Sequence, residues 1–276
     1  MQFRKNPADI QKEIEIYTRD FAPLPVTLSF KNIFYDSIDW SNPKSICEDA
    51  DALIFGGSGD LFFDGGLCHD DQAIVSSCTY AKLHEPLFKY LFAHHIPTLG
   101  ICFGHQMLAY THGVQVRNDT EQAKTGSHEV VLTEEGRMDP LFAGIPSQFT
   151  AQYGHRDSIS SLPDGAVLLA YGEQCRYSAV RLGPKRYSLQ FHPELIADDM
   201  RRRCADNPTY LPPGTDINTA IRESDDASKV LHNFVFNIMH AGATEEFIEE
   251  EIAMQENRFT TEQVLCSVSS NTRSSY

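Results

Sequence analysis

The sequence has no apolar run near the roughly 20 residues that span a bilayer, and its start, MQFRKNPADIQKEIEIY, lacks the apolar stretch of a signal peptide. It also has little positive charge. Its 23 Lys and Arg residues face 38 Asp and Glu residues, which gives a formal net charge of −15 and leaves no basic stripe. These absences argue against a membrane protein and against nucleic-acid binding. We expect a cytoplasmic protein that acts on a small molecule.

The seven cysteines include no CxxC pair, and their number is odd. This spacing argues against a disulfide framework and against a structural zinc site. Two other groups of metal-capable side chains, at 68–71 and 94–95, lack a third ligand at a suitable spacing. We therefore predict neither a metal nor an organic cofactor.

The length of 276 residues, with 41% hydrophobic residues, fits one α/β domain with a sizeable core. We assign residues 1–240 to this domain and 241–276 to an acidic C-terminal helix followed by a disordered tail. Residues 198–228 are polar and are interrupted by several prolines. They are predicted to form a long loop or lid.

Helical patterns at 7–20, 86–94 and 106–112 alternate with apolar runs in the first half of the chain. The runs expected to form strands are 26–34, 52–55, 98–101, 129–132, 167–170, 177–181 and 187–191. The short connection at 183–185 predicts a hairpin between the last two. The pattern favours an open, mixed, mostly parallel sheet with helices on both faces and a ligand site at the carboxyl ends of its strands.

The segment GICFGHQ, residues 100–106, places a cysteine between a strand and a helix. Gly100 and Gly104 flank Cys102 closely, as small residues do around the strained nucleophile of a strand, turn and helix elbow. A helix N-terminus and a neighbouring imidazole both favour the thiolate. Cys102 is the predicted nucleophile; the plainer alternative is a buried strand cysteine beside two packing glycines.

The segment LQFHPE, residues 189–194, supplies a base and a group to orient it. On an extended chain His192 and Glu194 point to the same side, so the carboxylate can hold the imidazole while the other ring nitrogen faces the thiol. An exposed turn after an edge strand is the alternative for this segment. Because the two motifs are independent, their joint occurrence favours a Cys-His-Glu triad.

A glycine-rich turn follows the apolar run in IFGGSG, residues 54–59. It lacks the Lys-Ser/Thr of a phosphate-binding P-loop and the spacing of a dinucleotide fingerprint. The backbone N–H groups of Gly57 and Phe103 are instead predicted to form an oxyanion hole, in which each donor contributes roughly 3 kcal/mol. The alternative is a plain tight turn.

These three segments together resemble the class I glutamine amidotransferases, and most of all the glutaminase domain of GMP synthetase and its stand-alone relatives. The resemblance covers about 26–240 and implies the family's flavodoxin-like fold. It implies that Cys102, His192 and Glu194 form the triad. The substrate contacts that it implies, including those of a segment similar to the family's Ser-His-Gly-Asp, fall on Gly104, Gln106, Tyr153, Gly154 and His155.

The sequence departs from the family at Gly154 and Arg156, and MQFRKN offers little of the usual first strand. Either that strand is degenerate or the chain begins inside the domain. The resemblance implies hydrolysis of the glutamine side-chain amide through a Cys thioester, with ammonia passing to a separate synthetase subunit. The alternatives are a stand-alone γ-glutamyl peptidase and a catalytically idle regulatory module.

Overall fold

A computed structural model describes residues 1–207 and 210–239 of the chain. The predicted C-terminal helix and tail at 241–276 lie outside the described residues. Within the described part, the main sheet has seven strands. In spatial order they are β1 (Leu53–Phe55), β2 (Thr98–Ile101), β9 (Arg186–Leu189), β8 (Ala179–Gly183), β7 (Val167–Tyr171), β4 (Lys124–Leu132) and β5 (Gln148–His155).

The predicted α/β fold with a mixed sheet is confirmed. β1, β2 and β9 run parallel, whereas each pair from β9 through β8, β7 and β4 to β5 is antiparallel. The parallel part is thus smaller than expected, because β5 was not recognised as a strand and the 26–34 run does not join the sheet. A two-stranded antiparallel sheet is formed by β3 (Val116–Asn118) and β6 (Asp157–Ile159).

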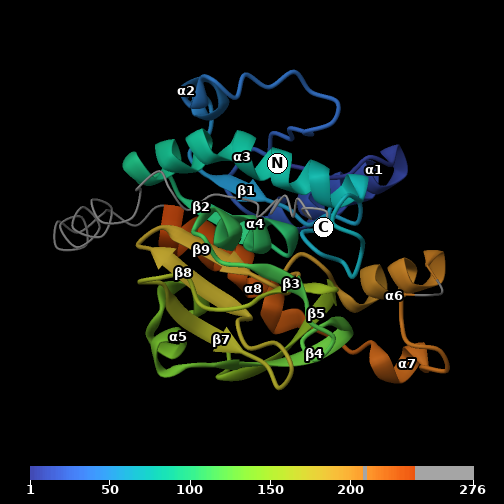
Figure 1. Ribbon diagram of the computed structural model, residues 1–276. Coiled ribbons are helices and arrows are strands. Elements are labelled where there is room, and N and C mark those ends of the chain that lie inside the picture. Colours follow the sequence, from blue (N-terminus) through green and yellow to red (C-terminus); the bar gives the residue numbers. More distant parts are fainter. Residues whose placement is uncertain (208–209, 240–276) are drawn as a thin grey trace, which may run out of the picture.

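Helices cover both faces of the sheet (Figure 1). The α-helices are α1 (Pro7–Phe21), α2 (Pro43–Cys47), α3 (Gln72–Ala93), α4 (Phe103–Thr111), α5 (Glu134–Met138), α6 (Ala197–Asp206), α7 (Ile217–Ala220) and α8 (Asp225–Asn233). In the part of the chain that the structure describes, a 3₁₀ turn η1 (Pro140–Phe142) and a π-helical segment η2 (Phe234–Met239) accompany these helices.

Successive side chains of the central strands point to opposite faces of the sheet, where they pack into two separate cores. In β2, Leu99 and Ile101 join a core that also holds side chains of α1 and α8. In β1, Leu53 and Phe55 join the other core, with side chains of α3 and α4. The helices α3 and α4 therefore lie on the opposite face from α1 and α8, as in Figure 1. Among the described residues, no helix combines the length and apolarity needed to cross a bilayer.

Two predictions about the N-terminal region are corrected. The apolar run at 26–34 is not a strand, because among the described residues its only strand-type pairing is a bridge between Gln2 and Asn32. Its side chains are nevertheless packed: Val26 contacts one core and Ile33 belongs to the other. The first residues lie beside β1, where the Gly56 N–H donates to the Met1 carbonyl at 3.1 Å. The first residues thus make a short backbone contact with the edge of the sheet.

Two helix predictions are also corrected. α3 begins at Gln72, where Asp71 caps its first turn, and Pro86 lies inside it rather than at its start. The predicted loop or lid at 198–228 holds α6, α7 and the start of α8. α6 is polar on one side only, because Met200 and Cys204 pack with neighbouring apolar residues in a small third core. Asp198, Arg202 and Asp206 are exposed and gave the segment its loop-like composition, whereas Asp199 is buried and pairs with Arg19.

Candidate active site

Three parallel strands end at one edge of the sheet and place the predicted site residues there. Phe55 of β1 pairs with Gly100 of β2, and Ile101 of β2 pairs with Leu189 of β9. The glycine-rich turn, Cys102 and His192 follow these strands directly. The predicted site residues thus lie together at the carboxyl ends of the parallel strands, where ligands bind in open α/β sheets.

Cys102 occupies a strained turn between β2 and α4. Its backbone has φ 53° and ψ −100°, a left-handed conformation that costs a non-glycine residue on the order of 1–3 kcal/mol. Its N–H donates to the Leu189 carbonyl at 2.8 Å, which fixes the turn to β9. A Cβ at Gly100 would lie 2.7 Å from the Gly104 oxygen, and one at Gly104 would overlap the Phe55 backbone. The two glycines are thus required by close packing around the elbow.

His192 is held by the backbone and by Glu194. Its N–H donates to the Gln152 carbonyl of β5 at 2.8 Å, and its Nδ1 lies 2.6 Å from Glu194 Oε1. Burial disfavours the charged imidazolium, but the Glu194 carboxylate and Cys102 favour it more strongly and raise the pKa of His192 to about 9. The imidazole is thus prepared to carry a proton beside the thiol.

Glu194 is almost completely buried, with 3% of its surface exposed. Burial raises the pKa of this carboxyl, but the neighbouring His192 outweighs burial, so the net shift is downward. Arg19 supports the turn from outside by donating from Nη2 to the Glu194 carbonyl at 2.8 Å. The carboxylate therefore remains charged and faces the imidazole.

Gly57 lies where the three strand ends converge. A Cβ built on it would be 2.9 Å from His192 Cε1 and 3.5 Å from Cys102 Cβ. Within the described residues, no acceptor is hydrogen-bonded to the N–H of Gly57 or of Phe103, whereas the Gly104 N–H is taken by the Gly56 carbonyl at 3.1 Å. Two donors are thus available beside the thiol.

Three of the predicted substrate contacts are buried in the structure: Gln106, Gly104 and Tyr153. The Gln106 side chain is buried and donates to the Asp157 carbonyl at 2.7 Å. Gly104 is packed under Phe55. Tyr153 is fully buried, and its hydroxyl donates to Ser178 Oγ at 3.0 Å. Gly104 and Tyr153 are both buried in the structure, and their contact with a substrate stays a prediction.

Gly154 and His155 end strand β5 on the side of His192. His155 is buried, its Nδ1 lies 3.0 Å from the Asp157 carbonyl, and its Nε2 has no partner among the described residues. A side chain at Gly154 would meet the hydroxyl of Tyr210, which donates to the Gly154 carbonyl at 3.4 Å. Glycine at position 154, where the sequence departs from the family pattern, thus makes room for Tyr210. Arg156, the other position that departs from this pattern, is exposed.

Two polar residues that were not predicted from the sequence, Arg4 and Tyr210, lie at this site. Arg4 Nη2 lies 3.6 Å from the position of a Cβ at Gly57, and its Nε donates to Glu13 Oε2 at 2.6 Å. A signal for Arg4 existed. Had residues 1–3 been read as extended chain beside β1, Arg4 would have been placed at the same strand edge. Tyr210 gives no local signal, because 108 positions separate it from Cys102 along the chain.

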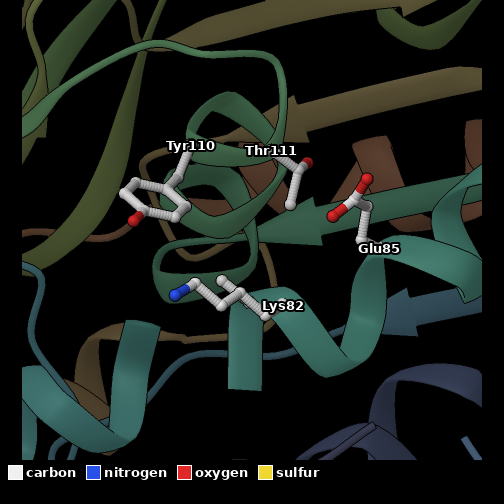
Figure 2. Close-up of a pocket in the computed structure, with 5 residues that line it drawn as sticks. Lys82, Glu85, Tyr110 and Thr111 are labelled. Atoms are coloured by element: carbon white, nitrogen blue, oxygen red, sulfur yellow. The ribbon is translucent and has the colours of Figure 1, made fainter. Parts of the chain in front are cut away.

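A surface hollow lies elsewhere, between α3 and α4 (Figure 2). It is lined by Ala81, Lys82, Glu85, Tyr110 and Thr111. None of these residues belongs to the strand-end site. Within residues 1–207 and 210–239, no three His, Cys, Asp or Glu side chains are grouped as a metal site.

Comparison with known families and proteins gives one consistent match. The family model "Glutamine amidotransferase class-I" matches residues 41–209. The chain is 38% identical over 102 residues to one subunit of the glutamine-hydrolyzing GMP synthase of Methanococcus maripaludis, covering 36% of this chain and 51% of that protein. It is 28% identical over 203 residues to the GMP synthase of Caldicellulosiruptor saccharolyticus, covering 72% of this chain and 34% of that protein. The chain thus spans about half of the length of the first relative and about a third of the length of the second.

Solved structures share the fold. A glutamine amidotransferase from Thermotoga maritima matches with a TM-score of 0.59 at 21% identity, covering 83% of this chain and 92% of that one. A putative GMP synthase subunit from Thermoplasma acidophilum matches with a TM-score of 0.55 at 19% identity, covering 88% and 92%. These likenesses support the chain fold described above.

Proposed function

Because the chain belongs to the class-I glutamine amidotransferase family, we propose that it hydrolyses the side-chain amide of glutamine to glutamate and ammonia. The observation that carries the proposal is the juxtaposition of Cys102, at the strained elbow, with the buried pair of His192 and Glu194. A nucleophile, a base and an orienting carboxylate are the groups that amide hydrolysis through a covalent intermediate requires.

In the proposed reaction, the Cys102 thiol gives its proton to His192 as Sγ attacks the amide carbon, and the N–H groups of Gly57 and Phe103 stabilise the resulting oxyanion. The tetrahedral intermediate collapses as the His192 imidazolium protonates the departing ammonia, which leaves a γ-glutamyl thioester on Cys102. Water, deprotonated by the same imidazole, then attacks the thioester, and glutamate leaves as the thiol is restored. Glu194 keeps the imidazole oriented throughout. The residues of the chain perform each step without a metal or organic cofactor.

We also propose that the ammonia passes to a separate synthetase subunit. The support is that the M. maripaludis relative is named as one subunit of a glutamine-hydrolyzing GMP synthase, so a protein similar to this chain is one part of such an enzyme. Ammonia released without an acceptor is lost to water, so slow turnover by the isolated chain is expected.

The test combines turnover with trapping of the intermediate. Purified chain is incubated with glutamine or a γ-glutamyl dipeptide, released ammonia or amine is measured, and acid-quenched protein is mapped for a γ-glutamyl adduct. We expect the adduct on Cys102 and glutamate release that Cys102→Ala abolishes. Cys68→Ala, which removes an exposed thiol, is the matched control and should behave as wild type. Absence of both adduct and turnover with either substrate would contradict the proposal.

A further inference from the structure

Arg4 brings a cation to the proposed reaction centre with its outer nitrogens unused. Its side chain is 12% exposed, and the Nε donates to Glu13 Oε2 at 2.6 Å. Among the described residues, no acceptor is hydrogen-bonded to Nη1 or Nη2. Nη2 lies 3.6 Å from the Cβ position of Gly57 and Nη1 lies 3.8 Å from that of Gly59. Both therefore face the glycine-rich turn that borders Cys102.

Tyr210 forms a second polar group beside the same centre. Its hydroxyl occupies the space that a side chain at position 154 would need, close to the end of β5 that holds His192. This hydroxyl lies within electrostatic range of Arg4, Arg203 and Cys102, and burial raises the pKa of Tyr210, so the hydroxyl keeps its proton. Its single proton points to the Gly154 carbonyl at 3.4 Å, a long contact that rotation of the hydroxyl can exchange for a hydrogen bond to a ligand oxygen.

We propose that Arg4 and Tyr210 form a carboxylate-binding subsite beside Cys102. The inference rests on the proposed function and deepens it, because it names the part of the substrate that is recognised. An arginine fork pairs with a carboxylate through two parallel hydrogen bonds, and a phenol adds a third donor.

The carboxylate has two sources in γ-glutamyl substrates. One is the α-carboxylate of the glutamyl part, which glutamine itself carries. The other is the carboxylate of the leaving amino acid, which only a γ-glutamyl peptide carries. Comparing glutamine with its α-amide isolates the first source, and comparing γ-glutamylglycine with γ-glutamylglycinamide isolates the second. Each comparison is a ratio of kcat/KM values.

The ratio separates recognition from reactivity. Removing a cation near Cys102 changes the reactivity of the thiol toward both members of a pair alike, so it cancels in the ratio. We expect wild type to prefer the carboxylate member of one pair, and Arg4→Gln and Tyr210→Phe to reduce that preference. For a charge-assisted hydrogen bond the reduction should be about 10- to 100-fold for Arg4→Gln, and smaller for Tyr210→Phe. Arg176→Gln, which removes an exposed cation, should leave the ratio unchanged.

Arg4→Gln leaves the Glu13 carboxylate buried without its cation, which can unfold the protein. The double variant Arg4→Gln/Glu13→Gln removes both charges and keeps the test available. The four compounds are also titrated by calorimetry into Cys102→Ala protein, with and without the Arg4 change. If the Cys102→Ala protein binds the carboxylate member of a pair more tightly, and the wild-type protein turns over none of the four compounds, the subsite is supported and the proposed hydrolysis is contradicted. Turnover with both ratios unchanged in the Arg4 and Tyr210 variants would overturn the subsite alone.

Discussion

His192 Nδ1 and Glu194 Oε1 are 2.6 Å apart, and each side chain is less than 5% exposed. Because both groups are removed from water, their interaction is little screened, and the carboxylate sustains a charged imidazole that burial alone would neutralise. The interaction raises the pKa of His192, and this pKa determines the pH dependence expected for turnover.

The first prediction concerns that pH dependence. The pKa of His192, raised to about 9, means that the acid for ammonia departure is present below about pH 9 and lost above it. Plots of kcat/KM against pH should therefore fall near pH 9 in wild type. Glu194→Gln removes the carboxylate but leaves burial, which lowers the pKa, so the fall should move to lower pH. An unmoved alkaline limb would contradict the role of Glu194.

The second prediction separates base from orienter. His192→Ala removes both the general base and the leaving-group acid, so turnover should fall by about 10⁵-fold or more. Glu194→Gln should keep a measurable rate because the imidazole remains. Steady-state kinetics with circular dichroism as a folding control gives the comparison. Wild-type turnover by folded His192→Ala would show that another residue is the base.

The third prediction uses two glycines of one turn. Gly57→Ala places a methyl group 2.9 Å from His192 Cε1, which must displace the imidazole, whereas Gly59→Ala meets nothing closer than Arg4 Nη1 at 3.8 Å. A displacement of about 1 Å at a catalytic group costs about 10²-fold in rate. Gly57→Ala should therefore lose about that factor in kcat, and Gly59→Ala should stay close to wild type. Equal rates in the two variants would place the reaction away from Gly57.

The fourth prediction concerns the elbow itself. Cys102→Gly and Cys102→Ala both lack the thiol, but only glycine adopts φ 53° without strain. Urea unfolding should show Cys102→Gly to be more stable than Cys102→Ala by about 1 kcal/mol, the reverse of the usual order of these residues. The usual order would contradict a strained nucleophile.

The fifth prediction concerns stability in acid. Burial lowers the pKa of His84 to about 4 and of His105 and His155 to about 3. Below about pH 6.5 the unfolded chain therefore binds protons that the folded chain does not bind. The free energy of unfolding should thus fall as pH decreases from 6.5 to 4. His84→Phe suits the aromatic surroundings, in which the Trp40 ring is 4.3 Å away, and should flatten this fall by up to about 1.4 kcal/mol per pH unit.

His69→Gln is the matched control for the acid prediction, because this histidine is exposed. It should leave the dependence of the unfolding free energy on pH as in wild type. Urea unfolding of the three proteins from pH 7 to pH 4 gives the comparison. Parallel curves for His84→Phe and wild type would show that His84 is protonated equally in both states.

Much of the candidate site could be predicted from sequence because each motif is local and follows a strand. The strand 98–101 was predicted with the bounds that β2 has, and the parallel register of β1, β2 and β9 then brings Gly57, Cys102 and His192 to one edge. Parallel strands bring their carboxyl ends to one edge of the sheet. Motifs that directly follow such strands can therefore be placed in one site without knowledge of other tertiary contacts.

The rest depended on contacts that no local pattern carries. Arg4 faces the site only because the first residues lie beside β1, and Tyr210 only because position 154 is a glycine. The 26–34 run has the apolar composition of a strand, yet within the described residues it packs its side chains and forms a single bridge instead of a ladder. α6 has the polar composition of a loop, yet Met200 gives it a buried side. In each case tertiary packing overrode composition.

The central claim is that Cys102 is the nucleophile, and labelling of the thiols tests it most directly. Cys47, Cys175 and Cys204 are buried and burial raises the pKa of each, whereas Cys68 is exposed. Iodoacetamide should therefore label Cys68 readily. A glutamine analogue with an electrophilic carbon in place of the amide should instead label Cys102 ahead of the other six cysteines, and excess glutamine should protect it. Preferential labelling of Cys68 or of another thiol by the glutamine analogue, unaffected by glutamine, would contradict the account.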